Sequence, residues 1–195
     1  MTRNVVNNVQ RLRRGEGEDM KRLTLLFLGF LLLPAFSAAQ QAPKPDVWGP
    51  WRFLVGNWTA DASGEPGEGK GTFSFTVELQ GKVLVRRGRT DFAATPARAA
   101  FSHEDLLIVY AEPGAAPNRA IYFDNEGHVI QYHVAFDAQG KVLTFLSESS
   151  PQAPRQRLTY TQNTDGTLKV TFALAPPRKP DAFTTHVEGV AHRAK

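Results

Sequence analysis

The amino-acid sequence predicts an all-β protein: a single up-and-down antiparallel β-barrel of about ten strands that follows a short N-terminal helical turn. Three observations lead to this prediction. Hydrophobic and polar residues alternate in most segments after Trp48, which is typical of half-buried strands. Glycine-containing turns separate these segments at short intervals. Only the stretch "WRFLVG" looks helical.

The chain of 195 residues begins with segments that we expect to lie outside the barrel. Residues 20–39 combine a basic start, an apolar run and a small-residue end, which predicts a cleaved signal peptide; an uncleaved anchor is the alternative. Residues 1–19 are predicted to be an extension that precedes the true start at Met20, because "RRGEGED" resembles a translated ribosome-binding site. Residues 40–47 are polar and contain prolines, so they predict a flexible arm before the barrel domain of residues 48–195.

Charge and cysteine content narrow the class of protein. Residues 40–195 carry 17 Lys or Arg against 16 Asp or Glu, so the mature chain is nearly neutral and a nucleic-acid partner is not expected. The sequence has no cysteine, which excludes disulfides, thiolate catalysis and a lipidated cysteine anchor. We therefore expect a periplasmic or extracellular bacterial protein that a hydrophobic core stabilises and that has no stable membrane anchor after signal cleavage.

The expected strands follow from alternation and turns. "TFSFTVEL", "VIQYHVAF" and "LKVTFALA" each place apolar residues on one face. "LQGKVL", "NEGHVI", "AQGKVL" and "TDGTLK" each place a glycine before a strand, where a tight hairpin needs positive φ. Closure into a barrel removes the exposed edges. The predicted strands span residues 57–63, 71–79, 82–92, 104–112, 118–124, 128–137, 141–149, 155–163, 167–175 and 181–193.

Gly56, Trp58 and Arg193 form a pattern that resembles the calycin superfamily, which includes lipocalins and nitrobindin-like haem barrels. In that superfamily a Gly-x-Trp opens the first strand, and a basic residue of the last strand lies across the indole. "GKVLVRRGRTDF" and "IYFDNEGHVI" also resemble small exported bacterial lipocalin-like proteins. The resemblance covers residues 48–195 and implies a barrel that encloses a small ligand.

The candidate ligand-binding residues are aromatic side chains and arginines of the expected strands. Alternation places Arg86 on one face and Arg87 and Arg89 on the other, so at least one guanidinium is expected to point inward, where it suits a carboxylate ligand. The alternative is that all three pair with acidic residues near the rim. Polar anchors are expected from Arg86 or Arg87, Tyr122 and Tyr132, and walls from Phe73, Phe75, Ile130, Tyr132, Val170, Phe172 and Phe183.

The other polar motifs are predicted to stabilise turns and loops, not to catalyse a reaction or bind a metal. "SHED" (102–105) is predicted to be a helix cap or part of a flap spanning residues 93–104, so no catalytic residue is expected. Asp124, Glu126 and His128 are interpreted as turn residues, not as a metal site. The resemblance to nitrobindin-like barrels implies a late-strand histidine for haem, but His186 and His192 are expected on the polar face, so no cofactor is predicted and haem remains the alternative.

These observations predict an exported lipocalin-like binding protein whose partner is a small, largely apolar molecule, with or without a carboxylate. The alternatives are a haem-binding barrel, an enzyme acting on a lipid-like substrate, and a structural or partner-binding barrel without a ligand. The sequence leaves the ligand and the oligomeric state open.

Overall fold

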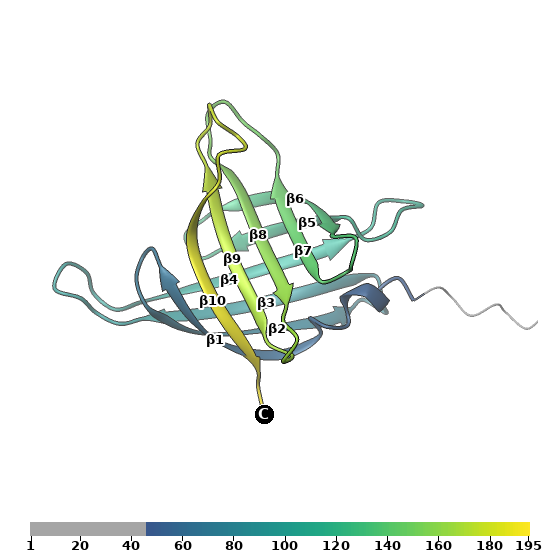
Figure 1. Cartoon of the computed structure of the whole chain (residues 1–195), viewed down its shortest axis with the longest axis horizontal. Coiled ribbons are helices and arrows are strands. Elements are labelled where there is room, and N and C mark those ends of the chain that lie inside the picture. The colour runs from purple at the N-terminus through teal and green to yellow at the C-terminus, as the bar shows by residue number, and fades with distance from the viewer. Residues whose placement is uncertain (1–45) are drawn as a thin grey trace, which may run out of the picture. The chain divides into compact units, whose positions relative to one another are not determined.

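The computed structural model describes residues 46–195, which form one closed antiparallel barrel of ten strands (Figure 1). This architecture confirms the predicted all-β, up-and-down fold. The predicted extension, the signal peptide and residues 40–45 of the arm lie outside the described residues. Within residues 46–195, no helix has the length and hydropathy needed to cross a membrane.

Each strand pairs with its neighbours in the chain, and β1 pairs with β10 to close the barrel. The short helical turn is a 3-10 helix, η1, at Gly49–Trp51. The strands are β1 (Gly56–Gly64), β2 (Gly69–Glu78), β3 (Val83–Phe92), β4 (Phe101–Tyr110), β5 (Arg119–Asp124), β6 (Val129–Phe136), β7 (Val142–Ser147), β8 (Arg155–Gln162), β9 (Leu168–Ala175) and β10 (Thr184–Arg193).

The start of β4 differs from the sequence prediction. The strand begins at Phe101, so "SHED" lies within it and not in a cap or flap turn. The pairing of Phe92 with Phe101 extends the ladder between β3 and β4, and the two rings stack with centroids 4.8 Å apart. This aromatic pair adds to the cross-strand packing and explains why the connecting loop is shorter than expected.

Aromatic side chains fill the half of the barrel next to η1. Trp48, Trp51 and Trp58 are all buried. The Trp51 ring packs edge-on against Phe136 at 5.2 Å, and the Trp58 ring stacks on Phe73 at 6.1 Å. Trp48 Nε1 donates to the carbonyl of Gly81, 2.9 Å away, in the turn between β2 and β3. The three tryptophans therefore plug this end of the barrel, which is the main hydrophobic core.

Gly56, Trp58 and Arg193 meet as the resemblance implied. The Arg193 guanidinium lies 4.5 Å from the centre of the Trp58 ring. It donates from Nη1 to the Val55 carbonyl at 2.8 Å and from Nη2 to the Phe53 carbonyl at 3.1 Å. Gly56 has a φ of 127°, and a Cβ there would lie 2.7 Å from Arg193 Nη1. Only glycine fits this close approach, so the three residues close the barrel together.

The other half of the barrel has small residues where the closed half has aromatic ones. Along β1, Ala60 and Ala62 follow Trp58 on the inner face. The register pairs Ala60 with Gly71 of β2 and Ala62 with Gly189 of β10. A patch of small side chains from three adjacent strands therefore leaves space inside the barrel.

Candidate functional site

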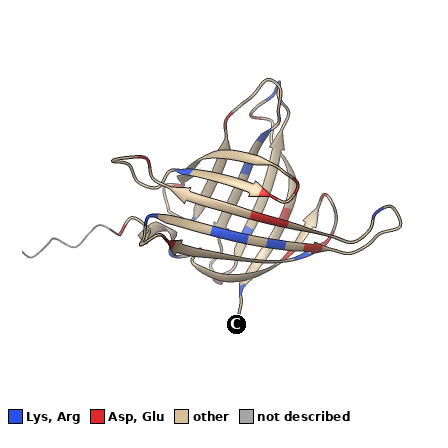
Figure 2. Ribbon diagram, turned by 180° about the vertical axis from the view of Figure 1, so that it is seen from behind, with Lys and Arg blue, Asp and Glu red and all other residues tan. Residues whose placement is uncertain are grey.

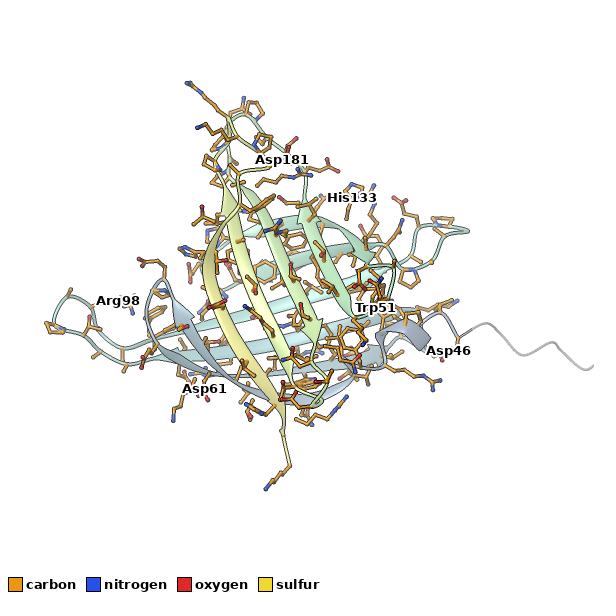
Figure 3. The ribbon with its side chains drawn as sticks, viewed as in Figure 1. Asp46, Trp51, Asp61, Arg98, His133 and Asp181 are labelled. Carbon is orange, nitrogen blue, oxygen red and sulfur yellow. The ribbon has the colours of Figure 1, made fainter. Side chains whose placement is uncertain are left out.

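A cavity of about 940 Å³ occupies this second half of the barrel. Its mouth is formed by the loops at the far ends of the strands, with Glu65, Pro66, Arg98, Ala153 and Pro154. Figure 3 shows Arg98 in the loop between β3 and β4, on the opposite side of the barrel from Trp51. The apolar walls consist of Phe73, Phe92, Phe101, Ile130, Leu158, Val170, Phe172, Leu174 and Val187.

Arg86 and Asp105 form an ion pair on the inner face of the barrel. The Arg86 side chain is 14% exposed and that of Asp105 is 7% exposed. Asp105 of β4 lies directly opposite Gly88 of β3, and a Cβ on Gly88 would lie 2.6 Å from Arg86 Nη1. Glycine at position 88 therefore makes room for the pair. The guanidinium also lies 5.0 Å from the centre of the Phe73 ring, so it borders the apolar wall.

Arg87 and Arg89 point outward, so of the three arginines only Arg86 lines the cavity. Arg87 Nη1 is 2.6 Å from Glu78 Oε1 on the outer surface, beside a separate hollow of about 480 Å³. Neighbouring side chains of a strand point to opposite faces. Because Arg86 points inward, Arg87 points outward, and this position does not support the expectation that Arg87 anchors a ligand inside the barrel. Figure 2 shows the basic residues of β3 beside acidic residues of β4.

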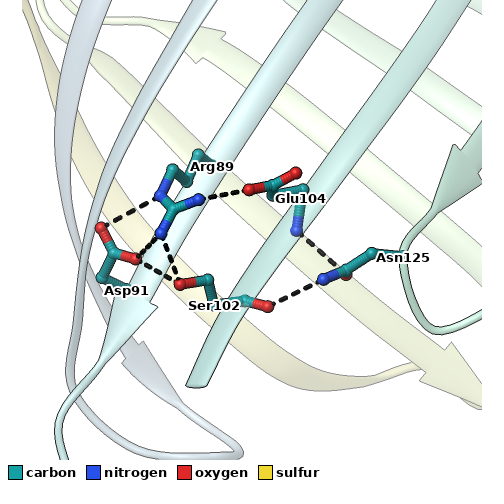
Figure 4. Close-up of polar contacts among 5 residues, drawn as sticks. All are labelled: Arg89, Asp91, Ser102, Glu104 and Asn125. Carbon is teal, nitrogen blue, oxygen red and sulfur yellow. Dashed lines mark hydrogen bonds and ion pairs between the residues drawn. The ribbon is translucent and has the colours of Figure 1, made fainter. Parts of the chain in front are cut away.

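The second outward arginine, Arg89, belongs to a polar network on the outer face (Figure 4). Arg89 Nη2 donates to Asp91 at 2.8 Å and to the Ser102 hydroxyl at 2.7 Å, and Nη1 pairs with Glu104. The Ser102 hydroxyl and the Arg89 guanidinium lower the pKa of Asp91. Asn125 bonds the backbone of β4 at Ser102 and Glu104, beyond the end of β5. The network fixes the register of these strands near the mouth.

A chain of three side chains crosses the cavity wall from its interior to its mouth. His103 Nε2 lies 2.9 Å from the Tyr122 hydroxyl, and His103 Nδ1 lies 2.9 Å from Glu126 Oε1. A carboxylate only accepts, so His103 Nδ1 carries the proton that it donates to Glu126. His103 Nε2 and the Tyr122 hydroxyl share a second hydrogen bond. Burial raises the pKa of Tyr122, and the charge of Asp124 raises it further, so the phenol keeps its proton. The Tyr122 oxygen is left to accept a hydrogen bond from a ligand.

The motif of Asp124, Glu126 and His128 organises the turn between β5 and β6. Asp124 Oδ1 accepts from the backbone amides of Glu126 at 3.0 Å and His128 at 2.9 Å, and Oδ2 lies 2.8 Å from His128 Nδ1. Residues 46–195 contain no group of three or more His, Asp or Glu side chains placed to hold a metal ion. These contacts are those of a turn-capping carboxylate.

Replacing Asp124 by asparagine is expected to reduce the acid sensitivity of folding. Burial by itself raises the pKa of Asp124, but the hydrogen bonds from His128 and Glu126 outweigh it and hold the pKa below its usual value. The charged form therefore stabilises the fold above the unfolded pKa of about 3.9, and this contribution is lost as the pH falls through the lower folded pKa.

Denaturant unfolding at a series of pH values tests this expectation. The difference in unfolding free energy between the wild type and Asp124→Asn should be constant above about pH 5 and should shrink below about pH 4. Asp61→Asn, at an exposed position of β1, serves as the control and should show no such change. An unchanged difference down to about pH 2 would rule out this role for Asp124.

The remaining predicted site residues divide between cavity and core. Phe73, Tyr122, Tyr132 and Phe172 line the cavity. Phe75 is fully buried in the closed half, with its ring 5.5 Å from that of Tyr160, so it supports the cavity without lining it.

Two residues of the last strand region lie elsewhere than predicted. Phe183 precedes β10 and packs against the Arg157 guanidinium, 4.1 Å from its ring, so it is not a cavity wall. The ladder between β9 and β10 shifts register between Thr185 and Val187. This irregularity interrupts alternation, and His186 lines the cavity with its ring 6.2 Å from that of Phe172.

His103, Asp105 and Asp124 are cavity residues that the sequence prediction did not assign to the site. The sequence does contain a pattern that predicts the inward direction of His103 and Asp105. Phe101, His103, Asp105, Leu107 and Val109 keep one period-two pattern, which places His103 and Asp105 on the same face as the buried Leu107 and Val109. Because the four residues of "SHED" are all polar, hydrophobicity does not reveal the alternation there.

Comparison with known proteins returned no matching family model and no matching curated protein. The fold and the cavity are therefore the basis for placing this protein in a class. Residues 46–195 form a closed, up-and-down antiparallel barrel of ten strands with a plugged end and an internal cavity. This architecture is consistent with a calycin-like fold.

Proposed function

We propose that this chain is an exported lipocalin-like binding protein that encloses a small, largely apolar molecule. The observation that carries the proposal is the cavity of about 940 Å³ with aromatic and aliphatic walls and a few polar groups. Ligand sites in proteins commonly have this volume and this composition. The plugged end and the Arg193 closure leave the cavity's mouth as the route of entry.

Apolar burial alone is sufficient for useful affinity. A micromolar complex needs about 8 kcal/mol, which corresponds to roughly 330 Å² of apolar surface at about 25 cal/mol per Å². Association costs raise this area. The described walls include four phenylalanines, Phe73, Phe92, Phe101 and Phe172, and such side chains supply large contact areas. Binding therefore requires no catalytic group.

Filling the cavity should abolish binding without unfolding the barrel. Ala62→Phe places a large ring among the small residues of β1, β2 and β10, where the cavity provides the space. We expect an affinity for the neutral fluorescent probe Nile red that is at least about tenfold lower, a change of about 1.4 kcal/mol. The free energy of unfolding should change by less than about 1 kcal/mol.

The matched control for this variant is Ser63→Phe. Ser63 is the next residue on β1 and is exposed, so the added ring lies outside the barrel and Nile red binding should stay within about threefold of the wild type. Equal binding by the wild type and Ala62→Phe would mean that the probe does not bind inside the barrel.

Native mass spectrometry of the protein purified from its own host tests the proposed function itself. A small molecule retained by the wild type and absent from Ala62→Phe supports a carrier. A clean mass for both, together with dimerisation, supports the partner-binding alternative instead. An intact mass that begins at Gln40 would reveal signal cleavage after Ala39, and recovery of the protein from the periplasmic fraction or the culture medium tests the proposed export.

One observation favours haem binding as a second candidate. His186 lines the cavity beside Phe172, and histidine is a common axial ligand of haem iron. The walls near His186 are apolar and suit a porphyrin. The test is the absorbance spectrum of the host-purified protein, in which a Soret band lost in His186→Ala supports haem and a spectrum without the band rejects it.

A further inference from the structure

The charged groups that line the cavity are not arranged to receive an anion. The lining contains four carboxylates, of Glu65, Asp105, Asp124 and Glu126, and two guanidiniums, of Arg86 and Arg98. An unpaired carboxylate on a ligand is stabilised in a poorly solvated site only if an available cation lies close to it. A ligand carboxylate therefore needs Arg86 or Arg98 to be free to pair with it.

Arg86 is the only guanidinium in the inner part of the described cavity, and its charge is already balanced. It pairs with Asp105, and both side chains are largely buried. Gly88 leaves the room that holds the two groups together. A ligand carboxylate next to Arg86 would also lie next to Asp105, which repels it. The sequence predicted that an inward arginine would bind a ligand carboxylate, but it did not predict that Asp105 would pair with Arg86.

Arg98 lies at the mouth, outside the inner part of the cavity, where a backbone carbonyl and an aromatic ring hold its guanidinium. Its Nη2 donates to the Pro66 carbonyl at 3.1 Å, and its guanidinium lies 4.3 Å from the centre of the Phe101 ring. These contacts join the loop between β3 and β4 to the loop between β1 and β2. The neighbouring Glu65 adds a negative charge at the same edge of the cavity.

The uncharged polar groups of the wall suit an oxygen atom without a full charge. Tyr132 lines the cavity, and burial raises the pKa of its hydroxyl, so it stays a neutral donor. The Tyr122 hydroxyl shares a hydrogen bond with His103, and its oxygen keeps a lone pair that can accept from a ligand. Together they match a hydroxyl, which donates and accepts, or a carbonyl, which accepts.

We propose that the cavity selects an uncharged ligand, an apolar molecule with a hydroxyl or carbonyl oxygen, over a carboxylate of the same size. An ammonium group is disfavoured as well: Asp105 pairs with Arg86, and both oxygens of Asp124 already accept hydrogen bonds within the turn between β5 and β6, so neither offsets the desolvation of a buried ammonium. This inference rests on the proposed function, since it describes what the proposed carrier accepts.

Three probes of equal chain length test the inference: dodecanol, dodecanoate and dodecylamine. Each competes with Nile red at neutral pH, dodecanol below its solubility limit and the two charged probes below their micellar concentrations. Dodecanol should bind at least about tenfold more tightly than either charged probe. Tightest binding by dodecanoate or by dodecylamine overturns the inference while leaving a carrier in place. If Nile red binds no more tightly to the wild type than to Ala62→Phe, or no probe displaces it, the proposed function fails and this inference with it.

Asp105→Asn tests the cause of the selectivity. Without the aspartate charge Arg86 becomes available, so dodecanoate should gain at least about tenfold in affinity while dodecanol stays within about threefold. Asp91→Asn removes an aspartate from the outer network and should change neither affinity. Unchanged dodecanoate binding by folded Asp105→Asn would contradict the role of the pair. If this variant does not fold, the wild-type ranking of the three probes still decides the inference.

Discussion

Replacing Arg86 by methionine is expected to lower the free energy of unfolding by about 3–5 kcal/mol. The change leaves Asp105 inside the barrel, where its side chain is only 7% exposed, without its partner. The remaining carboxylate is poorly hydrated at this exposure, so the cost of its desolvation adds to the loss of the attraction. Urea unfolding monitored by tryptophan fluorescence measures the effect.

The double variant Arg86→Met, Asp105→Leu separates the cost of an unpaired buried charge from the cost of lost side-chain packing. Because both charges are gone, its stability should return to within about 1–2 kcal/mol of the wild type. Arg87→Met on the same strand is the matched control. Its guanidinium is 59% exposed, so the loss of its pair with Glu78 should cost no more than about 1 kcal/mol. Equal losses in Arg86→Met and Arg87→Met would mean that the inner pair is solvated.

Replacing Trp58 by alanine is expected to cost about 3–5 kcal/mol, the range seen for large aromatic residues in protein cores. Trp58 is 1% exposed, and its ring contacts Phe73 on one side and the Arg193 guanidinium on another. Its Nε1 also donates to the Leu54 carbonyl at 2.8 Å. The substitution therefore removes the plug of the barrel, takes away the ring on which the Arg193 guanidinium lies, and leaves the Leu54 carbonyl without its donor.

Thermal and denaturant unfolding of Trp58→Ala and Leu79→Ala measure this role. Leu79 is 72% exposed in the turn after β2, so its truncation should change stability by less than about 0.5 kcal/mol. A small loss for Trp58→Ala, close to that of Leu79→Ala, would show that the tryptophan does not hold the closed end together.

The closed half of the barrel was predictable because its determinants are local. Gly56 and Trp58 lie two residues apart, and the period-two patterns of β2, β6 and β9 are read directly from the sequence. Alternation also placed Arg86 on the face opposite Arg87 and Arg89, but it left open which of the two faces points inward. Only Arg193 is distant in the chain, and the resemblance to calycins supplied it.

The cavity and its charges were not predictable by the same reasoning. The space depends on Ala60, Ala62, Gly71 and Gly189, which meet only when β1 pairs with both β2 and β10. The partner of Arg86 depends on the register between β3 and β4, which a one-residue error reverses. His186 faces the cavity because of a register shift, which alternation by itself cannot foresee.

The most direct test of a ligand-binding barrel is a crystal structure with a dodecanol that carries bromine at its far end, because the anomalous signal locates the bromine independently of the rest of the map. We expect one strong peak inside the barrel, among Phe73, Ile130 and Phe172. A bromine bound only on the outer surface, with the inner space filled by side chains, would contradict it.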